Sequence, residues 1–333
     1  MRGLVRLAAA LLLACASVGA FAQGTPPKLV RVIVFDGAWN LPIWAAQRQG
    51  LFLANGLVVS LAYTPNSVFM MQGLMEGRFD VALAGIDNLV GYQEGQGEVK
   101  TAETPDLFAF MGGDNGFLRL VAAPAVKSAA DLKGKTLSVD AMNTGFAFVL
   151  RELVGRSGVA EADVTYVRAG ATGNRYRAMM EGKQDATLLR PPFDLFARAR
   201  GYNVLATADA LGPYQGTSGV ARRAWARENE ASLVAFIRVY RAALDWLYDP
   251  RNRDTVETML IAYDRDMTGP LAKQAYDALI EPKGGLTRDA AIDVKGLETV
   301  LALRSKYGTP QKTLTDPMKY IDNSYFEKAS QKQ

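Results

Sequence analysis

Two stretches decide the fold because they repeat one pattern: MEGRFDVALAG at residues 75–85 and MEGKQDATLLR at residues 180–190. Each is typical of a helix that ends at a glycine, followed by a charged turn and a buried strand. The copies lie 105 residues apart and share Met, Glu, Gly, Asp and Leu at equivalent positions. Two explanations are open. Such junctions are common enough to coincide by chance, or the chain contains two α/β lobes of like topology, which is the interpretation we prefer.

Strands and helices alternate on both sides of each copy. The first run extends from KLVRVIVFD (28–36) to LFAFMGG (107–113), and the second extends from FLRLVAA (117–123) to YNVLAT (202–207). Such alternation predicts parallel α/β sheets. From residue 224 to about 329 the pattern is helical, with breaks at proline and glycine. The sequence therefore predicts an α/β fold with a C-terminal set of helices.

The N-terminus has the pattern of an export signal. Two arginines precede the apolar run 7–20, and Ala20-Phe21-Ala22 is a small-x-small cleavage site. We expect cleavage after Ala22, so that residues 1–22 are a signal peptide. The alternative is a lipobox around Cys15, which would anchor the protein through a lipid. Cys15 is the single cysteine of the sequence, so cleavage after Ala22 leaves neither a disulfide nor thiol chemistry.

Composition excludes several classes of function. The 333 residues contain no histidine, which rules out histidine-dependent acid–base catalysis, Ser-His-Asp triads and histidine-ligated metal. The formal net charge is +4 and no run of Lys and Arg stands out, so no nucleic-acid partner is expected. Beyond the signal, the sequence has no apolar run of about 18 residues or more, the length of a membrane span. We expect no cofactor, no metal and a monomer.

Candidate ligand contacts lie in the strand-to-helix loops, because open α/β sheets bind ligands at the carboxyl ends of their strands. Helix N-termini at that edge also present unpaired N–H groups. In the first run the candidates are Asp36, Trp39, Asn40, Asn66, Ser67, Asp87 and Asn88, and Asp114 lies in the GGDNG loop that directly follows this run. In the second run they are Asp140, Asn143, Thr144, Gly145, Phe146, Gly170, Thr172 and Arg190.

Several of these residues have a structural interpretation beside the functional one. Asn66 or Ser67 is expected to cap the helix that follows, and Asp36 and Asp87 either cap a helix or bind a ligand donor. Trp39 is a candidate stacking surface. Phe146 and Phe148 point to different sides of one helix, so one belongs to the core and the other can face a cleft. Arg190 either contacts a ligand or closes the cleft against a carboxylate of lobe 1; the alternative is a solvated arginine.

The ordered set PIWAAQRQGLFLANGLVV, MEGRFDVALAGIDNLV, SVDAMNTGFAFVLRELV and DATLLRPPF resembles the periplasmic solute-binding proteins of ABC importers. Within them it is most similar to the group that binds nitrate, aliphatic sulfonates, taurine and thiamine-pyrimidine precursors. The resemblance implies a type II, Venus-flytrap fold with lobe 1 at residues 28–113 plus 216–333 and lobe 2 at 114–215. GGDNG (112–116) and GPYQGTSG (212–219) would form the hinge.

The resemblance implies a function as well. We expect a periplasmic protein that captures a small organic solute, with a carboxylate or sulfonate favoured over an aminopyrimidine, and delivers it to an ABC permease at the inner membrane. Two other classes stay open: a ligand sensor that docks on a membrane receptor, and an enzyme on the same scaffold. Enzymes of similar fold depend on a histidine or a cysteine, so their absence from the mature chain favours binding over catalysis.

Overall fold

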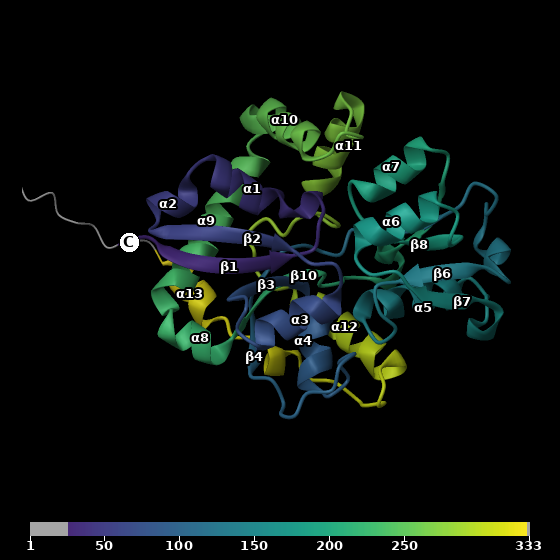
Figure 1. Ribbon diagram of the computed structural model, residues 1–333, viewed down its shortest axis with the longest axis horizontal. Helices are drawn as coiled ribbons and strands as arrows, with labels where there is room; N and C mark the ends of the chain where they lie inside the picture. The colour runs from purple at the N-terminus through teal and green to yellow at the C-terminus, as the bar shows by residue number, and fades with distance from the viewer. Residues whose placement is uncertain (1–25, 332–333) are drawn as a thin grey trace, which may run out of the picture.

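The computed structural model describes residues 26–331, which form two lobes side by side (Figure 1). Each lobe is built on a five-stranded sheet. The strand order is β2-β1-β3-β10-β4 in lobe 1 and β7-β6-β8-β5-β9 in lobe 2. The expected signal peptide and Cys15 lie outside the described residues. Among residues 26–331, no helix combines the length and the apolar character that a membrane span requires.

Lobe 1 starts with a βαβ arrangement and receives one late strand. Its strands are β1 (Lys28–Val34), β2 (Leu57–Tyr63), β3 (Val81–Gly85), β4 (Leu107–Gly112) and β10 (Thr217–Arg222). Its first helices are α1 (Leu41–Arg48), α2 (Leu51–Ala54), α3 (Ser67–Met75) and α4 (Ile86–Gln93). Gly50 follows the end of α1 with φ 66°, the left-handed conformation in which helices commonly terminate.

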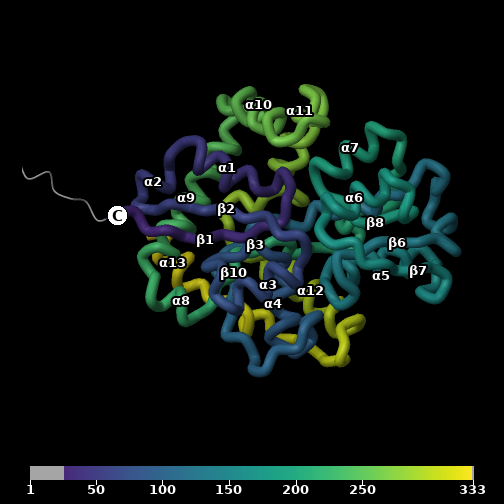
Figure 2. The backbone as a smooth tube through the Cα atoms, in the orientation of Figure 1, coloured from purple at the N-terminus to yellow at the C-terminus, as the bar shows by residue number. Residues whose placement is uncertain are grey.

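Lobe 2 is formed by one continuous piece of chain. Its strands are β5 (Arg119–Ala122), β6 (Thr136–Val139), β7 (Thr165–Arg168), β8 (Ala186–Leu189) and β9 (Asn203–Thr207). Its helices are α5 (Gly145–Arg156), α6 (Thr172–Met180) and α7 (Phe193–Ala199). In the tube drawing this lobe is the teal half of the molecule (Figure 2).

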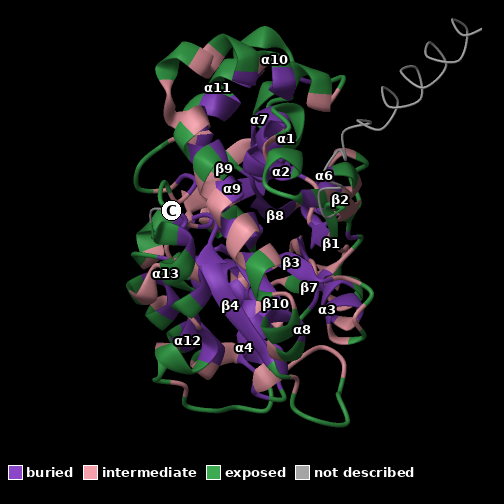
Figure 3. Cartoon of the chain, turned by 90° about the vertical axis from the view of Figure 1, so that its left-hand side faces the viewer, coloured by how far each residue is buried: buried purple, intermediate pink, exposed green. Residues whose placement is uncertain are grey.

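The C-terminal third is helical, as predicted, and returns to lobe 1. It consists of α8 (Arg223–Glu228), α9 (Glu230–Tyr248), α10 (Arg253–Tyr263), α11 (Gly269–Leu279), α12 (Val294–Tyr307) and α13 (Ser324–Ser330). Helix α9 packs on α1 and α13, whereas α12 contacts both α4 of lobe 1 and α5 of lobe 2. The sheets and the inner faces of the helices form the buried core, and the outer helical faces are exposed (Figure 3).

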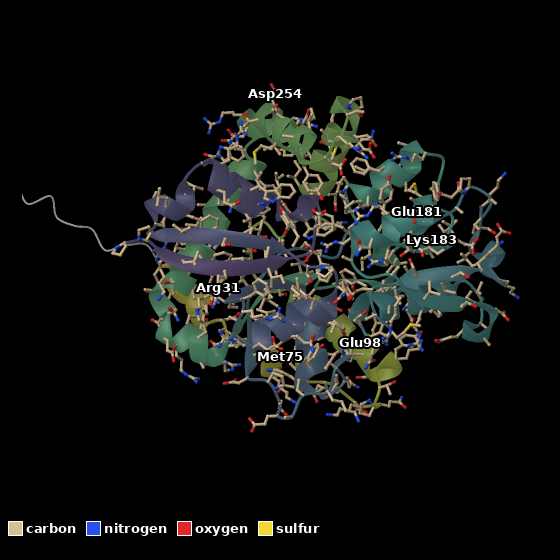
Figure 4. The ribbon with its side chains drawn as sticks, viewed as in Figure 1. Arg31, Met75, Glu98, Glu181, Lys183 and Asp254 are labelled. Carbon is tan, nitrogen blue, oxygen red and sulfur yellow. The ribbon has the colours of Figure 1, made fainter. Side chains whose placement is uncertain are left out.

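The repeated stretches occupy equivalent places in the two sheets. Helices α3 and α6 end just before Gly77 and Gly182, which adopt φ 75° and 70°. Strands β3 and β8 follow; β3 pairs in parallel with β1, and β8 pairs in parallel with β6. Figure 4 labels Met75 in one copy and Glu181 and Lys183 in the other, one copy on each side of the molecule. The interpretation as two lobes of like topology is confirmed.

A shared aspartate gives both copies the same contact. Asp80 accepts a hydrogen bond from the backbone N–H of Arg31 at 2.8 Å, and Asp185 accepts one from the N–H of Thr136, also at 2.8 Å. In each lobe the aspartate thereby connects the turn after the helix to the neighbouring strand. This shared contact explains why both copies have an aspartate at this position.

The expectation of wholly parallel sheets is wrong for one strand in each lobe. Strand β10 runs antiparallel to β3 and β4, and β5 runs antiparallel to β8 and β9. Both are the first strands after the chain crosses between the lobes, in the segments 113–118 and 208–216. A strand that enters from the opposite lobe starts at the cleft edge of the sheet, where the parallel strands end, so it must run the other way.

Candidate functional site

A cavity lies between the two sheets, at the carboxyl ends of β1, β3, β6 and β8. Lobe 1 contributes Phe35, Gly85, Asp87, Asn88 and Thr217, and lobe 2 contributes Asp140, Thr144, Gly145, Phe146, Thr172, Arg175 and Arg190. The volume that the centre of a water molecule can reach is about 30 Å³. About 10–15 Å³ of such volume accommodates one water, so the cavity is small. The lobes are closed on each other around it.

Half of the sixteen candidate residues line this cavity. They are Asp87, Asn88, Asp140, Thr144, Gly145, Phe146, Thr172 and Arg190. Ser67 and Asn143 border a smaller adjoining cavity that shares Asn88 and Thr144 with the first one. The expectation that one of the two phenylalanines of α5 faces the cleft agrees with this placement, because Phe148 is fully buried in the core.

Arg190 directly follows β8 and holds its charge in a buried ion pair. Its Nη2 lies 2.5 Å from a carboxylate oxygen of Asp114, and its Nη1 donates to the hydroxyl of Thr217 at 3.3 Å. The guanidinium carbon lies 4.0 Å from the ring centre of Trp39. Trp39 is thus a stacking surface for arginine, buried beside the cavity. The Nε atom is buried and has no hydrogen-bond partner among residues 26–331, so it remains a donor beside the cavity.

Asp87 is held by an arginine 217 residues further along the chain. Both its carboxylate oxygens accept hydrogen bonds from Arg304 of α12, at 2.6 and 2.5 Å. Arg304 is 1% exposed. The suggestion that Asp87 caps its helix is wrong: Gly85 occupies the N-cap position, and Asp87 lies in the first turn with its carboxylate turned to Arg304.

Asp140 connects the two lobes. Its carboxylate oxygens lie 3.1 and 3.3 Å from the backbone N–H of Ser67, the first residue of α3 in lobe 1. Burial raises the pKa of Asp140, while the hydrogen bonds from Ser67 and the charge of Arg175 oppose that rise. Asn66 is the N-cap of α3 and accepts from the N–H of Phe69, so the predicted capping at this position is confirmed.

Four lining residues were not among the candidates: Phe35, Gly85, Arg175 and Thr217. Arg175 is 2% exposed and donates to Gly170 O, Leu188 O and the hydroxyls of Thr172 and Thr187. Burial lowers its pKa to about 10, against the opposing charge of Asp140. The repeat could have identified two of the four, because the 105-residue offset aligns Gly85 with Arg190 and Phe35 with Asp140.

The other candidates have structural contacts. Asn40 is buried and its amide donates to the carbonyls of Phe35 and Gly37. Asp36 accepts from the hydroxyl of Tyr263, so it neither caps a helix nor lines the cavity. Gly170 has φ 77°, a conformation that favours glycine, in the turn before α6.

The lobes are in contact around the cavity. The N–H of Ala171 in lobe 2 donates to Pro65 O in lobe 1 at 2.9 Å, and the N–H of Ala38 donates to Pro191 O at 3.3 Å. These two contacts hold the lobes together beside the cavity.

Charge and polarity define what the cavity can hold. Three carboxylates (Asp87, Asp114, Asp140) and three guanidinium groups (Arg175, Arg190, Arg304) surround it, so its ionic groups balance. The N-termini of α3, α4, α5 and α6 start at its edge and favour negative charge. Among the described residues, no three His, Cys, Asp or Glu side chains are grouped as metal ligands would be. The arrangement can bind a small polar solute between Phe35 and Phe146.

Solved structures with this architecture are periplasmic-binding-protein folds. One is a protein of Bordetella bronchiseptica RB50 (TM-score 0.76, 21% identity, 91% of this chain and 96% of that one). Another is the alkanesulfonate-binding protein SsuA of Xanthomonas axonopodis pv. citri bound to MOPS (0.69, 16%, 88% and 96%). A third is the periplasmic nitrate-binding protein NrtA of Synechocystis PCC 6803 (0.76, 10%, 91% and 88%). At these identities the likeness shows the fold.

The family follows from the sequence itself. The model of the family described as NMT1/THI5 like matches residues 40–252, which is more than half of the chain. The protein therefore belongs to the NMT1/THI5-like family. A comparison with curated proteins gives no match.

Proposed function

We propose that this protein is the periplasmic solute-binding component of an ABC importer. It captures a small organic solute between its lobes and delivers it, as a monomer, to a permease at the inner membrane. The observation that carries this proposal is the closed cavity at the carboxyl ends of both sheets, lined from both lobes. The fold relatives that bind nitrate and alkanesulfonate support the same role.

A carboxylate or sulfonate is the favoured ligand. Four helix N-termini and the unpartnered Nε of Arg190 supply donors for its oxygens, and Phe35 and Phe146 supply apolar contact. Binding without catalysis is the simplest account, because the chain has no histidine. An aminopyrimidine is the second candidate. Asp140 favours it, because this cavity carboxylate has no cation of the described residues 26–331 within ion-pair distance and can accept from an amino group.

Native mass spectrometry of protein purified from its own periplasm tests the proposal. We expect one small molecule per chain, which is released on denaturation and whose mass and charge identify the class. Protein that arrives empty is then screened by thermal shift with alkanesulfonates, aromatic carboxylates, nitrate and aminopyrimidines, because a ligand that binds only the folded state raises its stability. Chemical turnover of a bound compound, or no binding from any of these classes, would contradict the proposal.

A pair of matched variants localises the binding. Phe146 lines the cavity, whereas Phe69 lies on α3 outside it and is 37% exposed. Phe146→Ala is expected to reduce the ligand-induced thermal shift, and Phe69→Ala is expected to retain it. Equal losses in both variants would place the ligand elsewhere.

A further inference from the structure

The loop between β6 and α5 in lobe 2 contains Asn143, whose polar groups are all bonded to lobe 1. We propose that Asn143 is the latch that holds the lobes closed. It is a positioning residue, which sets how long the cavity retains its solute without touching the solute. This inference deepens the proposed function and rests on it, because the molecule retained in the cavity is the solute proposed above. The closure itself can be tested without any ligand.

Five hydrogen bonds connect Asn143 to three segments of lobe 1. Its N–H donates to a carboxylate oxygen of Glu98 at 2.5 Å, and its Nδ2 donates to Gln96 O at 2.5 Å and Thr309 O at 2.9 Å. Its Oδ1 accepts from the N–H of Thr309 at 3.1 Å, and its carbonyl accepts from Nη2 of Arg304 at 3.0 Å. Both amide hydrogens have acceptors, so Asn143 has no donor left for a ligand.

The latch is connected to the cavity wall through one guanidinium. Arg304 bonds the carbonyl of Asn143 and, at the same time, both carboxylate oxygens of Asp87, which lines the cavity. The residues after Asn143, Thr144 and Gly145, line the cavity as well. Closure at Asn143 and assembly of the wall therefore occur together.

Two neighbouring contacts belong to the same closure. Glu98, which accepts from the N–H of Asn143, also pairs with Arg168 of lobe 2 at 2.8 Å. Figure 4 shows Glu98 at the boundary between the lobes. Gly145 packs so closely on Asp87 that an added Cβ would lie 2.5 Å from the Cβ of Asp87. A side chain at residue 145 would therefore act as a wedge between the lobes.

Spin labels on the two lobes measure the closure directly. Ser60 on β2 and Thr165 on β7 are exposed, and they lie on the sheet edges farthest from the crossover strands. Cys15 is the single cysteine of the sequence, so the full chain with Cys15→Ser, Ser60→Cys and Thr165→Cys carries two labels at known positions. Pulsed electron resonance then gives the distribution of label distances in the ligand-free protein.

The expected result is a main distance that matches the closed structure, with a shift to a longer distance in Asn143→Ala. Removing the side chain deletes three hydrogen bonds between the lobes, so the ratio of closed to open molecules should fall about tenfold or more. Asn203→Ala is the matched control. Its amide donates to carbonyls of residues 123, 124 and 126 within lobe 2, so the distribution should not change.

Two further variants keep the test decisive. Glu98→Ala removes the lobe 1 acceptor of the Asn143 N–H. If circular dichroism shows that Asn143→Ala is unfolded, Glu98→Ala becomes the deciding variant. Gly145→Ala should open the lobes by the wedge. The proposal is overturned if the parent protein shows only the longer distance, or if folded Asn143→Ala and Glu98→Ala keep the parent distribution. Neither result bears on whether the protein binds a solute, so failure of the proposed function remains separate.

Discussion

Lobe 1 and lobe 2 share one junction of helix, glycine and strand, and the two copies differ where the strand reaches the cavity. Gly77 and Gly182 have the same left-handed backbone, and Asp80 and Asp185 make the same 2.8 Å contact. At the end of the copies, Gly85 in one lobe aligns with Arg190 in the other, and both line the cavity.

The comparison separates two kinds of residue. Positions that match between the lobes hold the fold, and positions that differ between the lobes form the site. Phe35 and Asp140 are a second differing pair, and both again line the cavity. The difference makes the cavity asymmetric: lobe 1 leaves space at its central strand, and lobe 2 fills the equivalent place with a paired cation.

Replacing the cation should have the largest effect. Arg190→Ala leaves Asp114, which is 1% exposed, as a buried carboxylate without its cation, at an expected cost of about 3–5 kcal/mol in the free energy of unfolding. Urea denaturation measures this loss. Gly85→Ala is the equivalent change in lobe 1, where the new Cβ would meet only Asn88 Nδ2 at 3.8 Å, so we expect about 1 kcal/mol or less. Equal costs at both positions would contradict the asymmetry.

The shared aspartates should have similar effects in the two lobes. Asp80→Ala and Asp185→Ala each remove a charge-assisted bond to a backbone N–H, so each should lower the free energy of unfolding by about 1–3 kcal/mol. Asp80 also pairs with Arg31, whose side chain is 43% exposed, and that pair adds about 1 kcal/mol or less. If only one of the two variants lost stability, the two aspartates would share a position in the repeat but not a stabilising role. Urea denaturation of each variant against the parent decides this.

The repeated glycine should have a smaller effect. At Gly182, with φ 70°, a Cβ meets nothing within 4 Å, so Gly182→Ala carries the conformational cost alone, about 1 kcal/mol. Gly155 in the last turn of α5 has the same open surroundings without the positive φ, so Gly155→Ala should stabilise by up to about 1 kcal/mol. Thermal melting of the two variants should shift in opposite directions; a common direction would refute the conformational explanation.

Glu152 should show the smallest effect, as a dependence on pH. In lobe 1 the aligned residue is Gln47, which bonds within its own lobe, whereas Glu152 reaches Lys306 and Tyr307 on α12. Burial alone would raise the pKa of Glu152, but hydrogen bonds from Lys306, Arg156 and Tyr307 outweigh it and lower the pKa to about 2.

The depressed pKa of Glu152 determines how the free energy of unfolding depends on pH. The stabilisation is present above the ordinary value of 4.5 and is lost as the pH falls toward 2. Glu152→Gln should therefore be less stable than the parent by about 1 kcal/mol or less at pH 6, because both cations are more than half exposed. The difference should be largely lost by about pH 2. A gap that persists in acid would indicate a cause other than charge.

Much of the fold could be predicted because its signals are local. The glycine stops and the run of Val81–Gly85 specify their own elements, and the alternation implies the sheets. The direction of β5 and β10 could not be predicted, because the strands themselves do not reveal which lobe the chain has just left. Half of the candidate residues line the cavity, because loop residues such as Asp87 are recognisable from the local sequence. Arg304, the partner of Asp87, lies 217 residues away, and no local pattern indicates it.

Lobe 2 is a single run of chain from β5 to β9, but lobe 1 is interrupted by it. As the chain is synthesised from its N-terminus, lobe 2 is complete when Thr207 has emerged. Strand β3 can pair with β10 only after that, and Asp87 can pair with Arg304 only when α12 has been synthesised. Since domains fold as units, the order of synthesis places completion of the cavity between the lobes after that of lobe 2. A chain that stops before α12 would present a folded half and an unfinished one.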